Sequence, residues 1–178
     1  MQFMANPAMH PARLSTDELL ASCVLRALRR GGPGGQHRNK VETAVVIEHT
    51  PTGVRAEASE RRSQAENRRM AILRLRLLLA VQHRETSVAT AVGLGPASAL
   101  WHSRVSGTRI VVSTEHEDFP AVLAELLDGL HVLAYDMGEA AKHFAVTSSQ
   151  LVSLLRSHPP ALTWVNSIRI ALGVNRLR

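Results

Sequence analysis

Residues 29–40 read RRGGPGGQHRNK, and this stretch decides how the rest of the chain is interpreted. Four glycines and a proline fill positions 31–35, a composition that excludes the interior of a helix or a central strand. Glycine has no Cβ, so its backbone can come close to a partner. The flanking cations, with no acid among them, are Arg29, Arg30, Arg38 and Lys40. A bare backbone beside cations predicts a loop that enters a phosphate-dense environment.

Known glycine-rich phosphate loops do not match this stretch. A dinucleotide-binding loop needs Gly-x-Gly-x-x-Gly at the start of a long helix, and that pattern is absent. A P-loop needs Gly-Lys-Ser/Thr where this chain has Gln36-His37. On composition alone, an ordinary surface turn stays an alternative.

The downstream sequence adds three further motifs in a fixed order. They are NKVETAV at 39–45, HTPTGV at 49–54 and ERRSQAENR at 60–68. With Gly34-Gly35-Gln36, this succession resembles the catalytic domain of the class I peptide chain release factors. It is equally similar to the same domain in the related codon-independent ribosome-rescue proteins. The resemblance runs from about residue 29 to 69.

The resemblance implies hydrolysis of the ester between a nascent peptide and tRNA, inside the ribosome. Gly34 and Gly35 would allow unusual backbone conformations, and Gln36 would offer its N–H to the reacting centre while its side chain places the water. A ribose hydroxyl of the tRNA would assist proton transfer, so the protein supplies positioning and an electrostatic donor. The expected partners are the rRNA of the peptidyl transferase centre and peptidyl-tRNA. The expected RNA-contacting residues are Arg29, Arg30, His37, Arg38, Asn39, Lys40, Arg61, Arg62, Gln64, Asn67, Arg68 and Arg69.

Other catalytic chemistries lack their residues here. There is no Gly-x-Ser-x-Gly, Cys23 has no evident histidine partner, and His-Glu-x-x-His is missing. We therefore expect no metal and no cofactor. Six arginines cluster at the start and middle of the helix expected after Ser63, which phosphate binding explains better than solubility does. They are Arg61, Arg62, Arg68, Arg69, Arg74 and Arg76.

The chain also departs from the families that it resembles. Nothing in it is long enough to be a separate stop-codon-reading domain, so we expect codon-independent action. The rescue proteins end in a lysine- and arginine-rich tail, whereas only Arg169, Arg176 and Arg178 stand near this end. Arg38 replaces a position that is often aliphatic in the family.

Composition and charge bound the remaining possibilities. Apolar residues make up 45% of the chain and aromatics 3%, so the core must consist mainly of aliphatic side chains. No apolar run reaches the roughly 20 residues of a membrane span, and residues 1–13 do not form a secretion signal. These features predict a cytoplasmic location. The formal net charge of +6 lies entirely within residues 1–85, which points to a polyanionic partner for that half.

The first half predicts an α+β domain over 13–82, preceded by a flexible tail at 1–12. Ser15 and Glu18 form a capping box at the start of a short helix. Strands are expected at 22–30, 43–49 and 54–58, the last two forming a hairpin. Ser63 and Glu66 form a second capping box, and its helix runs to about residue 82. The stripe expected to cover the hairpin is Met70, Leu73, Leu77 and Ala80.

The second half predicts a linker over 83–114 and a small helical domain over 115–178. A short strand at 109–113 could extend the hairpin sheet. A helix at 118–134 would start with Asp118 as its N-cap, and a last helix would span 161–172. Residues 136–156 match helix-turn-helix spacing, with Ala145 where glycine is commoner and Thr147 or Ser148 capping the second helix. This domain could contact rRNA or another protein.

The sequence therefore predicts codon-independent peptidyl-tRNA hydrolysis on ribosomes by a small antiparallel sheet, a packed helix and an extended loop. One alternative is a non-catalytic ribosome- or RNA-binding protein, although two intact glycines in the loop argue against it. The other is a helix-turn-helix regulator that binds nucleic acid, against which the neutral second half argues.

Overall fold

The computed structural model describes residues 9–28, 43–84 and 96–178. Its first half is built on an antiparallel sheet with the strand order β1-β2-β3. The strands are β1 (Cys23–Leu28), β2 (Ala44–His49) and β3 (Val54–Ala58). The turn between β2 and β3 passes through Gly53 at φ +68°, a conformation that glycine adopts without strain. The predicted hairpin and α+β class are confirmed.

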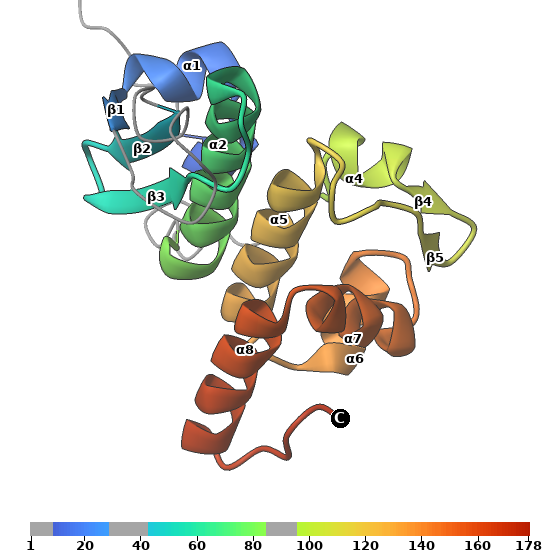
Figure 1. Cartoon of the computed structure of the whole chain (residues 1–178). Helices are drawn as coiled ribbons and strands as arrows, with labels where there is room; N and C mark the ends of the chain where they lie inside the picture. Colours follow the sequence, from blue (N-terminus) through green and yellow to red (C-terminus); the bar gives the residue numbers. More distant parts are fainter. Residues whose placement is uncertain (1–8, 29–42, 85–95) are drawn as a thin grey trace, which may run out of the picture.

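One face of this sheet is covered by the long helix α2 (Gln64–Gln82) (Figure 1). Leu25, Ile47 and Ala56 stand in register across the three strands on the covered face. Ser63 caps the helix, because its Oγ accepts a hydrogen bond from the Glu66 N–H at 3.3 Å. The predicted start and end of this helix are confirmed.

The predicted apolar stripe of α2 is confirmed only in part: Ala80 is buried, and Met70 and Leu77 pack partly buried against the core. The fully buried residues include Ala71, Leu75 and Leu79, whereas Leu73 is only partly covered. The reason is that α2 packs against the sheet on one side and against α5 (Phe119–Val132) on another. A helix with two partners buries a wider surface than the single stripe that a one-sided amphipathic pattern predicts.

The N-terminal elements are the 3₁₀ turn η1 (Pro11–Arg13), which packs against α2 and α5, and the helix α1 (Thr16–Ala21), which contacts β1. The Ser15–Glu18 capping box is confirmed in both of its hydrogen bonds. The predicted tail is too long, because His10 and Ala12 are 0% exposed. The His10 ring bonds the His83 carbonyl and the Ala12 N–H, so this stretch belongs to the core.

The second half surrounds α5, which lies between α2 and the remaining helices (Figure 1). Its other elements are α4 (Ala99–Ser103), β4 (Val105–Ser106), β5 (Arg109–Ile110), α6 (Met137–His143), α7 (Ser148–Ser157) and α8 (Pro159–Ala171). One continuous cluster of buried side chains includes residues of α2, α5 and α7. The domain limits at 82 and 115 stay predictions, and the two halves share a core across them.

The predicted linker and strand differ from the structure over residues 96–113. Trp101 on α4 is 0% exposed and its Nε1 donates to the Phe144 carbonyl at 3.0 Å. The strand predicted at 109–113 is reduced to β5, which pairs with β4 in a separate hairpin rather than with the β1-β2-β3 sheet. Burial of one large indole anchors a segment whose small residues resemble a linker in sequence.

Two contacting helices, α6 and α7, occupy the stretch predicted as a helix-turn-helix. Ala145 adopts φ +52° in the turn, which is the conformation that favours glycine there. Thr147 caps α7 by accepting from the Gln150 N–H. The Gln150 side chain on α7 accepts from the Ile110 N–H at 3.1 Å. The last helix is two residues longer at its start than predicted.

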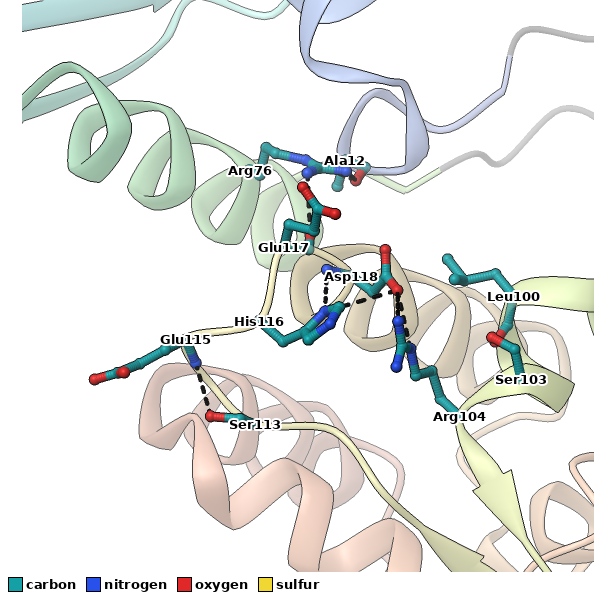
Figure 2. A network of polar contacts seen from close by, with 10 residues as sticks. All are labelled: Ala12, Arg76, Leu100, Ser103, Arg104, Ser113, Glu115, His116, Glu117 and Asp118. Carbon is teal, nitrogen blue, oxygen red and sulfur yellow. Dashed lines mark hydrogen bonds and ion pairs between the residues drawn. The ribbon is translucent and has the colours of Figure 1, made fainter. Parts of the chain in front are cut away.

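A polar network joins the two halves where α2 meets the segment before α5 (Figure 2). Arg76 donates to the carbonyls of Ala12 and Glu117, at 3.0 Å in each case. Asp118 stands at the N-cap position of α5 but makes no side-chain capping bond. Its carboxylate instead accepts from Arg104 Nε at 2.9 Å. The predicted capping interaction of Asp118 is therefore wrong, because the nearby guanidinium is the stronger partner.

Candidate functional site

Four arginines are exposed around the start of α2, beside the end of β3. Arg61 and Arg62 precede the helix, and Arg68 and Arg69 follow one turn later. Among the described residues, none of these four guanidinium groups has an acidic partner within ion-pair distance. Gln64, also predicted to contact RNA, is exposed in the same turn. Unpaired guanidinium groups on one surface are suited to contact phosphates.

The other two arginines of the predicted basic cluster have different roles. Arg74 forms an ion pair with Glu60 and donates to the Glu57 carbonyl at 2.7 Å. Arg76 is 8% exposed and is surrounded by backbone carbonyls. The buried guanidinium of Arg76 contradicts the phosphate-binding interpretation, whereas that of Arg74 is half-exposed and its phosphate contact stays a prediction.

Glu60 keeps its negative charge beside Arg74. The Ser59 N–H donates to its carboxylate at 2.9 Å, and this bond, followed by the arginine, lowers the pKa of Glu60. The acid at the edge of the basic surface is thus already engaged. Its ion pair is with Arg74 and not with Arg61 or Arg62.

Asn67 differs from its predicted role. It is 0% exposed, although Gln64, Arg68 and Arg69 around it are exposed. Its Nδ2 donates to the Thr43 carbonyl at 2.6 Å and to the Arg61 carbonyl at 2.9 Å. A buried amide with these partners offers no atom to an RNA backbone, so Asn67 belongs to the scaffold beneath the surface.

The predicted catalytic residues Gly34, Gly35 and Gln36 lie outside the described residues. The same holds for six of the predicted RNA contacts, namely Arg29, Arg30, His37, Arg38, Asn39 and Lys40. The structure does describe both ends of that segment: Leu28 pairs with Ala44 across β1 and β2. The chain therefore leaves the sheet and returns to it at one place, and Thr43 at the return is bonded to α2.

The sequence interpretation missed one exposed cation, Arg26 on β1. In register it stands beside Val46 and Glu57, on the face of the sheet that α2 does not cover. Alternation along 23–28 could have identified its exposed position. It extends the positive charge to the strand that precedes the glycine-rich segment.

Other kinds of site find little support in the described part of the chain. No group of three or more His, Cys, Asp or Glu side chains there is arranged to hold a metal ion. No helix among those residues combines the length and apolarity needed to cross a bilayer. The basic surface at the start of α2 is thus the candidate site.

Comparison with known proteins supports this assignment. Residues 20–94 match the RF-1 domain family. Peptide chain release factor 1 of Chloroherpeton thalassium is 40% identical over 114 residues, covering 57% of this chain and 30% of that protein. A peptide chain release factor homolog of Escherichia coli is 39% identical over 79 residues, covering 43% and 39%.

A mitochondrial release factor-like protein of Saccharomyces cerevisiae, named as uncharacterized, is 42% identical over 69 residues, covering 38% of this chain and 44% of that protein. The chain thus spans less than half the length of each of these three relatives. The matched residues contain the sheet, α2 and the exposed arginines. Over residues 20–94, the chain carries an RF-1 domain of the class I peptide chain release factor family.

Proposed function

We propose that this protein hydrolyses peptidyl-tRNA on the ribosome without reading a stop codon, and that it releases peptides from stalled ribosomes. The observation that carries the proposal is the set of four exposed arginines beside the return of the glycine-rich segment. Such a surface can bind rRNA phosphates on either side of the reacting ester. The RF-1 domain supports the choice of ester.

In this mechanism the protein contributes position and a hydrogen-bond donor. Gly34 and Gly35 would allow the backbone to approach the ester, and the Gln36 N–H would donate to the oxygen that gains charge. The Gln36 side chain restricts the place of the attacking water. Orientation and a preorganised donor are sufficient to lower the barrier when rRNA and tRNA complete the site.

The proposed independence from the codon is based on how residues 96–178 pack in the fold. Residues 96–178 include α5, which covers α2, and α4 and α6–α8 around it. Peptide release should therefore proceed equally on ribosomes with an empty A site and with a sense codon there. A strict requirement for a stop codon would exclude the rescue function but would remain compatible with hydrolysis of peptidyl-tRNA.

The second half adds a possible contact of its own. Residues 115–136 contain six acids and no Lys or Arg, whereas residues 137–178 contain five cations and one acid. Several of the acids are engaged internally: Asp118 with Arg104, Glu125 with Ser98, and Asp128 with Arg84. The exposed cations that remain are concentrated toward the C-terminus, at Arg156, Arg176 and Arg178. We propose rRNA as the partner of this surface.

The decisive experiment measures release of labelled peptide from ribosomes stalled on an mRNA without a stop codon. Wild type should release the peptide, while Gly35→Ala and Gln36→Ala should bind these ribosomes and release it far more slowly. Arg109→Gln, which changes an exposed residue of β5, is the control outside the glycine-rich segment. Binding without release by wild type would instead support the non-catalytic alternative.

Deletion of residues 115–178 would be a poor test of the second half. Because α5 packs along α2, that deletion would expose the side of α2 that α5 covers. Arg176→Gln with Arg178→Gln removes two exposed charges and leaves the core intact. Weaker ribosome binding with an unchanged saturating release rate is the expected result.

The helix-turn-helix alternative is weakened by the contacts of α7. Gln150 is engaged by β5, and Arg156 is the only Lys or Arg on α7. Specific duplex binding normally needs several phosphate contacts as well as base contacts. Salt-dependent filter binding with duplex DNA would restore this alternative if it gave submicromolar affinity.

A further inference from the structure

The start of α2 has one residue whose environment the surface does not explain. Asn67 is fully buried, while the residues immediately before and after it are exposed. Burying an amide is unfavourable unless its polar atoms are hydrogen-bonded. All three hydrogen bonds of the amide are with backbone atoms, so the side chain satisfies main-chain groups that no strand or helix pairs there.

These contacts join three segments of the chain. The Arg61 N–H donates to Asn67 Oδ1 at 2.9 Å, and Asn67 Nδ2 donates back to the Arg61 carbonyl at 2.9 Å. The same Nδ2 donates to the Thr43 carbonyl at 2.6 Å, 24 positions earlier in the chain. One side chain on α2 thus fixes both the turn that carries Arg61 and the point where the chain enters β2.

Helix capping does not require these bonds. Ser63 already accepts from the Glu66 N–H, and it is the N-cap of α2. Packing alone would be served by an apolar side chain at position 67, as it is at Ala71 one turn later. The bond to Thr43 therefore has a consequence for position rather than for helix formation.

We propose that Asn67 is a positioning residue, which fixes the returning end of segment 29–42 relative to the arginines at the start of α2. When these four arginines bind phosphates, the side-chain amide of Asn67 would transmit their position to the segment that carries Gly34-Gly35-Gln36. The arginines are Arg61, Arg62, Arg68 and Arg69. This inference rests on the proposed function of the loop. It assigns Asn67 an effect on the rate of release at saturation rather than on ribosome binding.

The sharpest variant is Asn67→Asp, which preserves size and the acceptor for the Arg61 N–H. It replaces the donor to Thr43 with an acceptor that faces two carbonyls. We expect the saturating release rate to fall by about tenfold or more, because small misplacement of a reacting group is costly. The half-saturating protein concentration should change by less than about threefold, which separates positioning from binding.

Ser63→Ala is the matched control in the same turn. It removes the hydrogen bond to the Glu66 N–H and leaves the contacts of Asn67 in place. We expect this variant to release peptide at the wild-type saturating rate. A purely structural role for Asn67 would instead make both variants follow their thermal stability, with equal losses of rate at equal melting temperature.

A pH profile gives a second readout from the same variant. The introduced carboxyl is buried against two carbonyls, which favours its protonated form. Once protonated, it can donate to the Thr43 carbonyl again. The ratio of variant to wild-type rate should therefore rise as the pH falls from about 8 to 6. A ratio that is flat over this range would contradict the donor role.

Hydrogen exchange tests the connection without any catalysis. In Asn67→Ala, amides at 43–45 and at 61–62 should both exchange faster, whereas Ser63→Ala should affect only the first turn of α2. Unchanged exchange at 43–45 in a folded variant would overturn the inference. If wild type releases no peptide at all, the proposed function fails, and the exchange result still decides whether Asn67 positions these segments.

Discussion

The two ends of α2 carry the same residue type with opposite roles. At its start, Arg68 and Arg69 are exposed and have no ion-pair partner among the described residues. In its second half, Arg76 is 8% exposed and bonds three carbonyls, and just beyond the helix Arg84 pairs with Asp128 at 2.7 Å. The density of positive charge in the sequence does not distinguish the arginines at the two ends. The comparison teaches that an arginine is available to RNA only where no second layer of the fold covers its side of the helix.

The largest expected effect comes from removing the buried charge, with Arg76→Met. The carbonyls of Ala12, Leu14 and Glu117 lose their charged donor, and that of the fully buried Ala12 has no access to water. We expect the free energy of unfolding to fall by about 3–5 kcal/mol. Urea denaturation followed by circular dichroism measures this, with Arg69→Met as the exposed control on the same helix. Equal midpoints for the two variants would remove the distinction between the two ends.

The second effect is a pH dependence at the buried end. Burial of His10 is the main reason that its pKa is lowered from 6.5 to about 4. Its Nδ1 accepts from the Ala12 N–H, so the neutral ring donates to the His83 carbonyl through Nε2. Because the unfolded state binds the proton first, stability is complete above pH 6.5 and decreases as the pH falls toward 4. The loss amounts to about 3 kcal/mol.

Denaturation at a series of pH values checks this prediction, with His10→Gln as the comparison. The variant should show a shallower decrease of stability between pH 6.5 and 4. Burial also lowers the pKa values of His49, His143 and His158, so part of the slope should remain. Identical slopes for wild type and variant would show that His10 is not the group responsible.

A smaller effect is expected from Asp128→Asn on α5. The guanidinium of Arg84 lies 4.8 Å from the centre of the Trp164 ring and pairs with the Asp128 carboxylate. The amide still accepts a hydrogen bond but no longer neutralises the charge. We expect a loss of about 2 kcal/mol in the free energy of unfolding. A melting temperature equal to that of wild type would mean that this pair adds no net stability.

The smallest stability effect belongs to the exposed end, with Arg68→Gln and Arg69→Gln combined. We expect a change below about 0.5 kcal/mol, because no contact within the described structure is lost. The slope of log affinity for stalled ribosomes against log salt should become shallower by about 0.7–0.9 per phosphate contact removed. Arg55→Gln with Arg109→Gln carries the same change in charge on other surfaces. A double variant that binds like this control would separate the basic surface from ribosome binding.

Local sequence rules succeeded at three of the four predicted helix caps, the exception being Asp118. The Ser15–Glu18 capping box, the Ser63 cap and the Thr147 cap each join groups three residues apart, and all three are present. Such bonds depend on residue type and spacing alone. The hairpin followed for the same reason, from alternation on both sides of a Pro-Thr-Gly turn. Four arginines and Gln64 at 61–69 are exposed, as an RNA-contacting surface requires. Asn67, which the sequence also assigned to that surface, is buried.

What the sequence could not assign depends on partners far along the chain. Arg76 is covered through contacts 41 and 64 positions away, and Asn67 through one 24 positions away. The Asp118 carboxylate accepts from Arg104 instead of capping α5, and the Trp101 indole donates to the distant Phe144 carbonyl. To predict any of these contacts one must know which elements pack together, and helical periodicity does not give that information.

The amino-acid sequence is sufficient to predict the release-factor domain, its α+β class, three of its helix caps and a basic segment next to a glycine-rich one. Which arginines remain exposed depends on the packing of distant elements, because α5 and η1 cover one side of α2 and leave its start uncovered. It also decided that Asn67 faces inward to Thr43 and Arg61. Short-range bonds follow from residue type and spacing, whereas burial follows from the packing of distant segments.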